Sequence, residues 1–423
     1  MNWDVTYYPE YWNGKKLAYP EVPREHAKFA QSITVGNLVF ASGCTGVGAP
    51  ADDIAAQVTA ALDKTRAALE TAGSSMENIV KTFFMVRSLD DYQLVRKTET
   101  EYYERHAPKL VETPPAATLM VIGALAKPEY RVEYEAIAAI DRTAPDWGVT
   151  YYPEFWAGKE LAYPHVPKDH AKFARTQVVG NLVVVSGCQA LDHDSVRVET
   201  ADFREQSRLV LEKIKIGMEE TGGSLSSVVK TNVFLKDVDL ISVYREVERE
   251  FFQQHDPQAA ANPPASTVYV CVELPRPEFL IEVEAFGVAD TAAPGWDSVF
   301  YAGNKEASSV VRAGNLLFLS GCDGTDPASG KVTSDAVADQ VRTALDKVRT
   351  AMEEAGSSLE KLVKITLMLK NIEDYPAMRR AECEYYEQHA PHLLAHPPAC
   401  TFIQMPEITG GGTLFQIDAT GVL

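Results

Sequence analysis

A five-residue segment that occurs three times constrains the fold of this chain more than any other feature. Its copies read Pro-Pro-Ala-Ala-Thr at 114–118, Pro-Pro-Ala-Ser-Thr at 263–267 and Pro-Pro-Ala-Cys-Thr at 397–401. Each copy opens an alternating run of apolar residues, which is typical of a half-buried strand. Only the fourth residue differs, so this position is where the copies become chemically different.

Other motifs recur with the same spacing, so the repeat covers the whole chain. Each copy carries Gly-Asn-Leu and then Ser-Gly-Cys, beginning at Gly36, Gly180 and Gly314. Dividing 423 residues by three gives 141 per copy, a length at which a domain buries its own core. That period is longer than the roughly 20–50 residues of a solenoid repeat. We therefore predict three domains, at residues 1–143, 144–290 and 291–423.

Within each copy, the pattern of apolar residues predicts the element order β-β-α-β-α-β-β. In the first copy the Gly-Asn dipeptide suits a tight hairpin turn, and Asp52 or Asp53 suits the cap of a helix that ends near Gly73. An apolar strand follows at 79–86, and we expect it in the middle of a sheet. A second helix at about 92–105 and two further strands complete the unit. This order predicts an α+β fold.

The composition is that of an ordinary globular protein without a membrane segment. Of its residues 46% are hydrophobic and 23% charged, and no apolar run approaches the roughly 18 residues that span a bilayer. The first residues lack the basic and apolar regions of a secretion signal, so we expect a cytoplasmic location. With 40 basic and 59 acidic residues the net charge is -19, which disfavours nucleic acid as a partner.

The metal-binding residue types show no ligand pattern. No two of the six cysteines form a C-x-x-C pair, which disfavours a disulfide framework and a zinc site. No cluster of His, Asp or Glu has ligand spacing either. We therefore expect no metal and no other cofactor, and a small molecule as the partner.

Four motifs in order carry a family resemblance. In the first copy they are Gly-Asn-Leu-Val-Phe-Ala-Ser-Gly, Ile-Val-Lys-Thr, Tyr-Tyr-Glu-Arg-His-Ala-Pro, and Pro-Pro-Ala with Val-Glu-Tyr-Glu-Ala-Ile-Ala. Each third of the chain resembles the RidA (YjgF) family of reactive-intermediate deaminases, over nearly the whole of each copy. Members are homotrimers with a chorismate-mutase-like fold and clefts between subunits. The resemblance therefore implies that this one chain forms a monomeric pseudo-trimer with three unequal clefts, and further self-association stays open.

The resemblance also places site residues. In the family's imine and enamine deaminases, an Arg binds the substrate carboxylate, a Glu of the final strand positions water, and a backbone Gly and a Tyr complete the site. The Arg is missing in every copy, since its positions hold Ala117, Ser266 and Cys400. The Glu falls on Glu133 and Glu282 but on Gln416 in the third copy, the Gly on Gly43, Gly187 and Gly321, and the Tyr on Phe29, Phe173 and Ala307.

An arginine recurs at one point of the second helix, as Arg96, Arg245 and Arg379. It is a candidate for a cation that takes over the lost carboxylate contact from the strand. The alternative is a solvated arginine paired with an acid three residues later, namely Glu99, Glu248 or Glu382.

The cysteines offer a second chemistry. Cys44, Cys188 and Cys322 follow the cleft glycine, so they are candidate substrate-binding thiols that attack only if a neighbour lowers their pKa. The alternative is a buried cysteine that behaves as a small apolar residue. Cys400 differs because it replaces the family arginine in one copy only, which makes it a candidate nucleophile.

The final strand carries acids in pairs. Glu133 lies two residues before Glu135, as Glu282 lies two before Glu284, so each pair shares one strand face. A carboxyl in a water-poor cleft acts as a general base, and the alternative is charge on the outer surface. The recurring lysines at the start of the 79–86 strand and its equivalents are predicted to be surface residues, namely Lys81, Lys230 and Lys364.

The first two copies carry an aromatic N-terminal extension that the third lacks. It reads Tyr-Tyr-Pro-Glu-Tyr-Trp from Tyr7 and Tyr-Tyr-Pro-Glu-Phe-Trp from Tyr151. We favour a clamp that packs on a neighbouring domain, and the alternative is a lid over two of the three clefts.

These features favour a divergent enzyme of this family that acts on a small imine-like or enamine-like metabolite in clefts between domains. Hydrolysis, tautomerisation or related C–N chemistry would use Glu133 and Glu282, with Cys400 marking a changed third site. The alternative is a pseudo-trimer that binds or regulates without catalysis. Endoribonuclease-like activity ranks last because it conflicts with the negative charge.

Overall fold

Each third of the chain repeats the predicted order β-β-α-β-α-β-β. The computed structural model describes residues 2–192, 197–198, 200–303 and 306–423. Domain 1 contains β4 (Ala30–Val35), β5 (Leu38–Ala41), α1 (Ile54–Thr71), β7 (Ile79–Val86), α2 (Tyr92–His106), β8 (Ala116–Val121) and β9 (Val132–Ala139). Domain 2 contains β13 (Ala174–Val179), β14 (Leu182–Gln189), α4 (Phe203–Glu220), β15 (Val228–Leu235), α5 (Leu240–His255), β16 (Ala265–Val270) and β17 (Ile281–Val288). Domain 3 contains β19 (Val310–Ala313), β20 (Leu316–Leu319), α7 (Val337–Glu354), β24 (Leu362–Leu369), α8 (Tyr375–His389), β25 (Ala399–Gln404) and β26 (Phe415–Val422).

Each domain also contains shorter strands or helices. An extra strand precedes each domain, namely β1 (Val5–Pro9), β10 (Val149–Pro153) and β18 (Ser298–Tyr301). Small hairpins follow the first two of these strands, β2 (Tyr11–Trp12) with β3 (Lys15–Lys16) and β11 (Phe155–Trp156) with β12 (Lys159–Glu160). Another hairpin, β22 (Thr325–Asp326) with β23 (Lys331–Val332), lies between β20 and α7 in domain 3. The other short pieces are β6 (Cys44–Thr45), β21 (Cys322–Asp323), α3 (Lys109–Glu112), α6 (Pro257–Ala261) and α9 (His392–Ala395).

The strands of each domain form one sheet. In domain 2 their order is β10-β13-β14-β17-β15-β16, and domains 1 and 3 repeat it as β1-β4-β5-β9-β7-β8 and β18-β19-β20-β26-β24-β25. The strand β7 lies between β9 and β8 with all eight residues buried, so the predicted mid-sheet position is confirmed. A bridge between Ala399 of β25 and Ala30 of β4 joins the sheets of domains 3 and 1.

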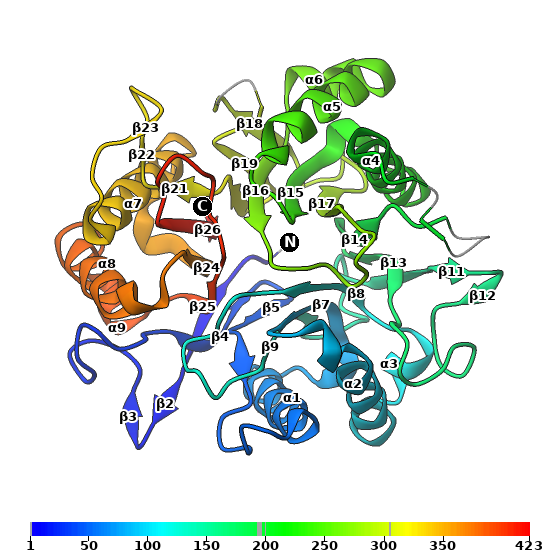
Figure 1. The fold of residues 1–423 in the computed structure, drawn as a ribbon, viewed down its shortest axis with the longest axis horizontal. Coiled ribbons are helices and arrows are strands. Elements are labelled where there is room, and N and C mark those ends of the chain that lie inside the picture. Colours follow the sequence, from blue (N-terminus) through cyan, green and yellow to red (C-terminus); the bar gives the residue numbers. More distant parts are fainter. Residues whose placement is uncertain (1, 193–196, 199, 304–305) are drawn as a thin grey trace.

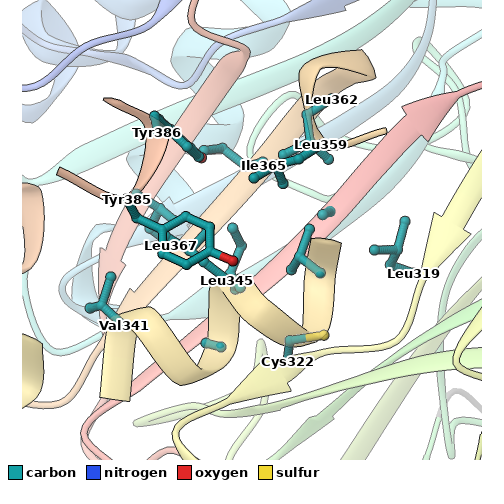
Figure 2. Close-up of a cluster of buried hydrophobic side chains, with 14 of the residues drawn as sticks. Leu319, Cys322, Val341, Leu345, Leu359, Leu362, Ile365, Leu367, Tyr385 and Tyr386 are labelled. Carbon is teal, nitrogen blue, oxygen red and sulfur yellow. The ribbon is translucent and has the colours of Figure 1, made fainter. Parts of the chain in front are cut away.

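The long helices cover one face of each sheet. Asp53 caps α1 by accepting a hydrogen bond from the N–H of Ala56, and the apolar stripe of this helix is buried from Ile54 to Leu69. Figure 1 shows the helices at the rim of the molecule and the strands toward its middle. Figure 2 shows the packing in domain 3, where Val341 and Leu345 of α7 lie with Tyr385 of α8.

The opposite faces of the three sheets meet at a common central axis. One buried cluster there draws residues from all three domains, among them Val35, Val179 and Ala313. Three tryptophans pack edge to face, with 4.9 Å between the ring centres of Trp3 and Trp147, 5.0 Å between Trp3 and Trp296, and 5.5 Å between Trp147 and Trp296. Two of them belong to the segments that join the domains. The chain is therefore a pseudo-trimer.

The recurring lysines lie near this axis, so the prediction that they are surface residues is wrong. Lys81 pairs with Glu284 at 2.5 Å, Lys364 with Glu135 at 2.8 Å, and Lys230 with Asp418, each time between neighbouring domains. All three lysines are buried. The face of the strand that would be exposed in one isolated domain is covered by the next domain. We call these six residues the axial ion-pair ring.

Candidate active site

The fourth residue of the repeated segment lies at each seam between domains. The backbone N–H of Cys400 donates to Oγ of Ser42 at 2.8 Å, and the N–H of Gly43 donates back to the carbonyl of Cys400 at 3.1 Å. The other seams repeat the first contact at 2.9 Å, between Ala117 and Ser186 and between Ser266 and Ser320. Each domain thus gives this segment to one neighbour and its Ser-Gly-Cys turn to the other.

Two of the seams open into cavities, which we call the 3/1 cleft and the 1/2 cleft after the domains that form them. The 3/1 cleft has a volume of about 470 Å³ and the 1/2 cleft one of about 200 Å³. Equivalent residues line both, namely Glu10 and Glu154, Trp12 and Trp156, Phe29 and Phe173, Gly43 and Gly187, Lys64 and Lys213, Lys127 and Arg276, Glu133 and Glu282, Arg379 and Arg96, and Cys400 and Ala117.

In both clefts a glutamate lies directly against a glycine. A Cβ atom added at Gly43 would overlap the carboxyl of Glu133, and one at Gly187 would overlap that of Glu282. These glycines therefore allow a close approach of the carboxyl to the backbone. In the seam between domains 2 and 3, the amide of Gln416 takes the place of the carboxyl beside Gly321.

Burial makes both glutamates weak acids. Loss of water contact raises the pKa of Glu133 to about 8; Glu135 adds to the rise, and Lys364 opposes it. Burial likewise raises the pKa of Glu282 to about 8, with Gln189 and Lys81 opposing. The alternative that these acids lie on the outer surface is thus wrong, and each is mainly protonated at neutral pH.

The helix arginines are paired as predicted but are not solvated. Arg96 lies 3.0 Å from Glu99, Arg245 lies 2.7 Å from Glu248 and Arg379 lies 3.0 Å from Glu382, and all six are buried.

The small fourth residue of the repeated segment leaves room for each guanidinium. Arg245 Nη2 donates to Oγ of Ser266 at 2.9 Å, and Arg379 Nη2 lies 3.7 Å from Sγ of Cys400. A helix arginine therefore reaches the place where the resemblance puts an arginine on the strand.

The cysteines are neutral thiols. Cys44 and Cys322 pack in domain cores, and Cys188 both packs in a core and borders the 1/2 cleft. Burial raises the pKa of Cys188 and of Cys322 to about 12, and it also raises the pKa of Cys44 and Cys400. Cys400 does line the 3/1 cleft. Neighbouring cations, such as Arg379 beside Cys400, oppose this rise only in part, so burial disfavours a thiolate at these positions.

The aromatic extensions act at two places. Their hairpins bring Trp12 and Trp156 to the clefts, where Lys127 lies 5.2 Å from the Trp12 ring centre and Arg276 lies 5.5 Å from that of Trp156. Further along, the N–H of Tyr19 donates to the carbonyl of Leu394 at 3.0 Å, which fastens the first extension to domain 3. The first extension thus contacts a neighbouring domain, as predicted for a clamp, and the same extension also borders a cleft. Figure 1 shows both hairpins projecting at the rim.

The seam between domains 2 and 3 lacks the residues that define the other two clefts. Gln416 replaces the acid, Gly410 stands at the position of Lys127, and only residues 302–309 separate β18 from β19, where domain 1 has its hairpin. Ser266, Arg245 and Gly321 remain at this seam.

Several charged cleft residues were not predicted from the sequence, among them Lys64, its equivalent Lys213, Lys127 and Arg276. For Lys64 and Lys213 the only signal was recurrence, since a lysine also stands at Lys347 of domain 3. Among the described residues, no group of three or more His, Cys, Asp or Glu is arranged to hold a metal ion. In the same part of the chain, no helix has the length and apolarity needed to cross a lipid bilayer.

Comparison with known proteins identifies the three units. A family model described as Endoribonuclease L-PSP matches residues 20–140, 164–289 and 303–423. The chain belongs to this family. Its similar relatives include RutC and RidA proteins, as the sequence resemblance implied.

Single-domain relatives of this family match one third of the chain at a time. A RutC family protein of Pyrococcus abyssi is 34% identical over 128 residues, which is 30% of this chain and 94% of the relative. The 2-iminobutanoate/2-iminopropanoate deaminase of Salmonella typhimurium is 31% identical over 128 residues, which is 29% of this chain and 96% of the enzyme. These relatives support an imine-deaminase-like role for the family.

One solved structure matches most of the chain. A chorismatase structure covers 82% of this chain and 93% of its own length, with a TM-score of 0.51 and 12% sequence identity. At that identity the likeness concerns the fold alone. It matches an arrangement that no single-domain relative spans.

Proposed function

We propose that this L-PSP family protein hydrolyses a small imine or enamine in its 3/1 and 1/2 clefts, with Glu133 and Glu282 as the acid–base residues. The observation that carries the proposal is a buried carboxyl with a pKa of about 8 in each cleft. Such a group holds a proton at neutral pH and loses it readily, as acid–base catalysis requires. The named activity of the Salmonella relative, a deaminase of imines, lies in the same reaction class.

One carboxyl is sufficient for the hydrolysis. The neutral carboxyl gives its proton to the imine nitrogen, water adds to the iminium carbon, and the carboxylate takes a proton from that water. The resulting carbinolamine then receives the proton on nitrogen and releases ammonia or an amine. The carboxylate takes up the hydroxyl proton as the carbonyl product forms, so the acid is restored.

Ribonuclease activity is the weaker candidate, although the family description names it. A net charge of -19 repels an RNA backbone, and the acid–base residues lie in buried clefts.

Without the family's strand arginine, each cleft still has its helix arginine, which is already paired with a carboxylate. Because this arginine is already paired, the proposed hydrolysis does not depend on a carboxylate in the substrate of each cleft.

The test is turnover of a panel of small imines by wild type and by glutamine variants. We expect Glu133→Gln and Glu282→Gln each to remove the activity of one cleft, and the double variant to lose roughly 100-fold or more in kcat/KM. Wild-type activity should fall as pH rises above about 8, because the acid ionises.

The matched control is Gln416→Leu in the third seam, which should keep full activity. A double glutamine variant that turns over as fast as wild type would refute the assignment of these residues. If wild type turns over no member of the panel, the alternative of a binding protein without catalysis replaces this proposal.

A further inference from the structure

The two clefts share a plan but differ in size and wall. The 3/1 cleft has more than twice the volume, at about 470 Å³ against about 200 Å³. Six aromatic residues line the 3/1 cleft and four line the 1/2 cleft. One exchange contributes to this contrast, because Phe402 stands where the smaller cleft has Leu119. The larger cleft therefore offers flat apolar walls to a ring.

The clefts differ also in a lysine. In the 1/2 cleft, Nζ of Lys213 donates to the carbonyls of Gln189 and Leu191 at 2.8 and 2.7 Å. In domain 3 the equivalent Lys347 pairs with Asp323 at 2.9 Å. In the 3/1 cleft, half-buried Lys64 has neither an ion pair nor a hydrogen bond to any described residue.

A glutamate differs in the same way. In the 1/2 cleft, Glu154 pairs with Arg175 at 3.2 Å, whereas domain 1 has Gln31 at the position of that arginine. The equivalent Glu10 accepts a hydrogen bond from the N–H of Tyr11 at 2.9 Å and has no cation within ion-pair distance among the described residues.

The other charged groups of the 3/1 cleft are engaged. Arg379 pairs with Glu382, Glu25 pairs with Arg380, and Lys127 lies over the Trp12 ring. Glu133 is mainly neutral at pH 7, since its pKa is about 8. Among the described residues, the cation of this cleft with no ion pair, hydrogen bond or ring contact is therefore Lys64, and the anion without an ion pair is Glu10.

We propose that the 3/1 cleft selects an aromatic substrate that carries both a carboxylate and an amine-derived cation, with Lys64 binding the carboxylate and Glu10 the cation. This assignment rests on the proposed function for the chemistry and adds the substrate class of one cleft. The ring packs among the aromatic walls. The 1/2 cleft, with its lysine and glutamate already satisfied, takes smaller uncharged compounds.

The test is calorimetric binding of stable probes to the Glu133→Gln/Glu282→Gln double variant, so that no turnover is needed. The probes are L-phenylalanine, L-alanine without the ring, benzoate without the amine, and phenethylamine without the carboxylate. We expect L-phenylalanine to bind tightest. Lys64→Met should weaken it by about 10- to 100-fold and leave phenethylamine unchanged, since one charged contact is lost. Glu10→Gln should weaken phenethylamine and L-phenylalanine but not benzoate.

The matched control is Lys213→Met in the 1/2 cleft, which should leave all four affinities unchanged. Each of four results would overturn the assignment. They are an equal loss of affinity in this control, no loss in Lys64→Met, equal binding of L-alanine and L-phenylalanine, and no binding of any probe. Failure here with glutamine-sensitive turnover leaves the proposed function standing. If the probes bind as expected but the Glu133→Gln/Glu282→Gln variant turns over imines as fast as wild type, the proposed function alone is overturned.

Discussion

Glu282 illustrates what burial does to a single side chain in this protein. The carboxyl is fully buried, and this burial raises its pKa to about 8. In the unfolded chain the same group ionises near pH 4.5, its ordinary value. Between those two pH values the folded state holds a proton that the unfolded state has released. The contribution of Glu282 to stability is therefore largest below pH 4.5 and is lost as pH rises to about 8.

This linkage predicts a pH-dependent gain from Glu282→Gln. The variant should match wild type in unfolding free energy near pH 4.5 and exceed it increasingly up to pH 8, because glutamine does not ionise. Urea unfolding from pH 4.5 to 8.5 measures the difference. Glu373→Gln, an exposed acid in the same protein, should show no such trend. A constant difference across this range would contradict the raised pKa.

At the scale of elements, the hairpins β2–β3 and β11–β12 are the parts that the third domain lacks. Each carries a tryptophan to the mouth of one cleft, where a cation from the segment before the last strand lies over the ring. The same extension begins with a strand paired to the sheet and ends on a neighbouring domain. The hairpin is thus held at both ends while its tip covers a cavity.

Removing one tryptophan should open one cleft and spare the other. Trp12→Ala should speed the reaction of Cys400 with a thiol reagent, because this thiol lines the 3/1 cleft. The free energy of unfolding should fall by less than about 1 kcal/mol, since the cation–ring contact is exposed. Peptide mass spectrometry of the labelled protein locates the modified thiol. Trp156→Ala should instead expose Cys188, and an unchanged Cys400 rate in Trp12→Ala would rule out a lid.

The axial ion-pair ring acts on the whole molecule. Each lysine belongs to one domain and each acid to the next, so the three pairs connect all three domains. Buried pairs of this kind are costly to break, because the remaining charge has no partner and no water. The ring therefore favours the one arrangement in which every lysine meets an acid.

Breaking one pair should be costly and repairable. Lys81→Met strands the Glu284 carboxylate and should destabilise the protein by about 3–5 kcal/mol, measured by urea unfolding. Adding Glu284→Gln should restore most of the loss, since the amide keeps a hydrogen bond to Asn232 or Thr118. Lys370→Met removes a partly exposed pair with Glu407 and should cost less than about 1 kcal/mol. Equal losses in the two lysine variants would show that the ring is not important for stability.

The sequence predicted the helices and strands better than it predicted which side chains are buried. The threefold repeat, the element order and the i, i+3 pairing of Arg96 with Glu99 all follow from local spacing. The burial of Arg96 and Lys81 depends on residues far along the chain. A small residue on a neighbouring strand makes room for the arginine, and a second domain covers the lysine. Lys64 was missed because its lack of a partner is visible only in space.

Trp3 takes part in the central tryptophan cluster without belonging to a linker. The linker tryptophans Trp147 and Trp296 come with the peptide chain that joins domains 1 to 2 and 2 to 3, whereas Trp3 arrives from the free end of the chain. Both termini lie toward the middle of the molecule in Figure 1. Domains 3 and 1 are therefore joined by noncovalent contacts without a linker segment, and the larger of the two clefts lies at their interface. A bulkier ligand is therefore accommodated at the seam that has no linker, in about 470 Å³, and not at the seam between domains 1 and 2, in about 200 Å³.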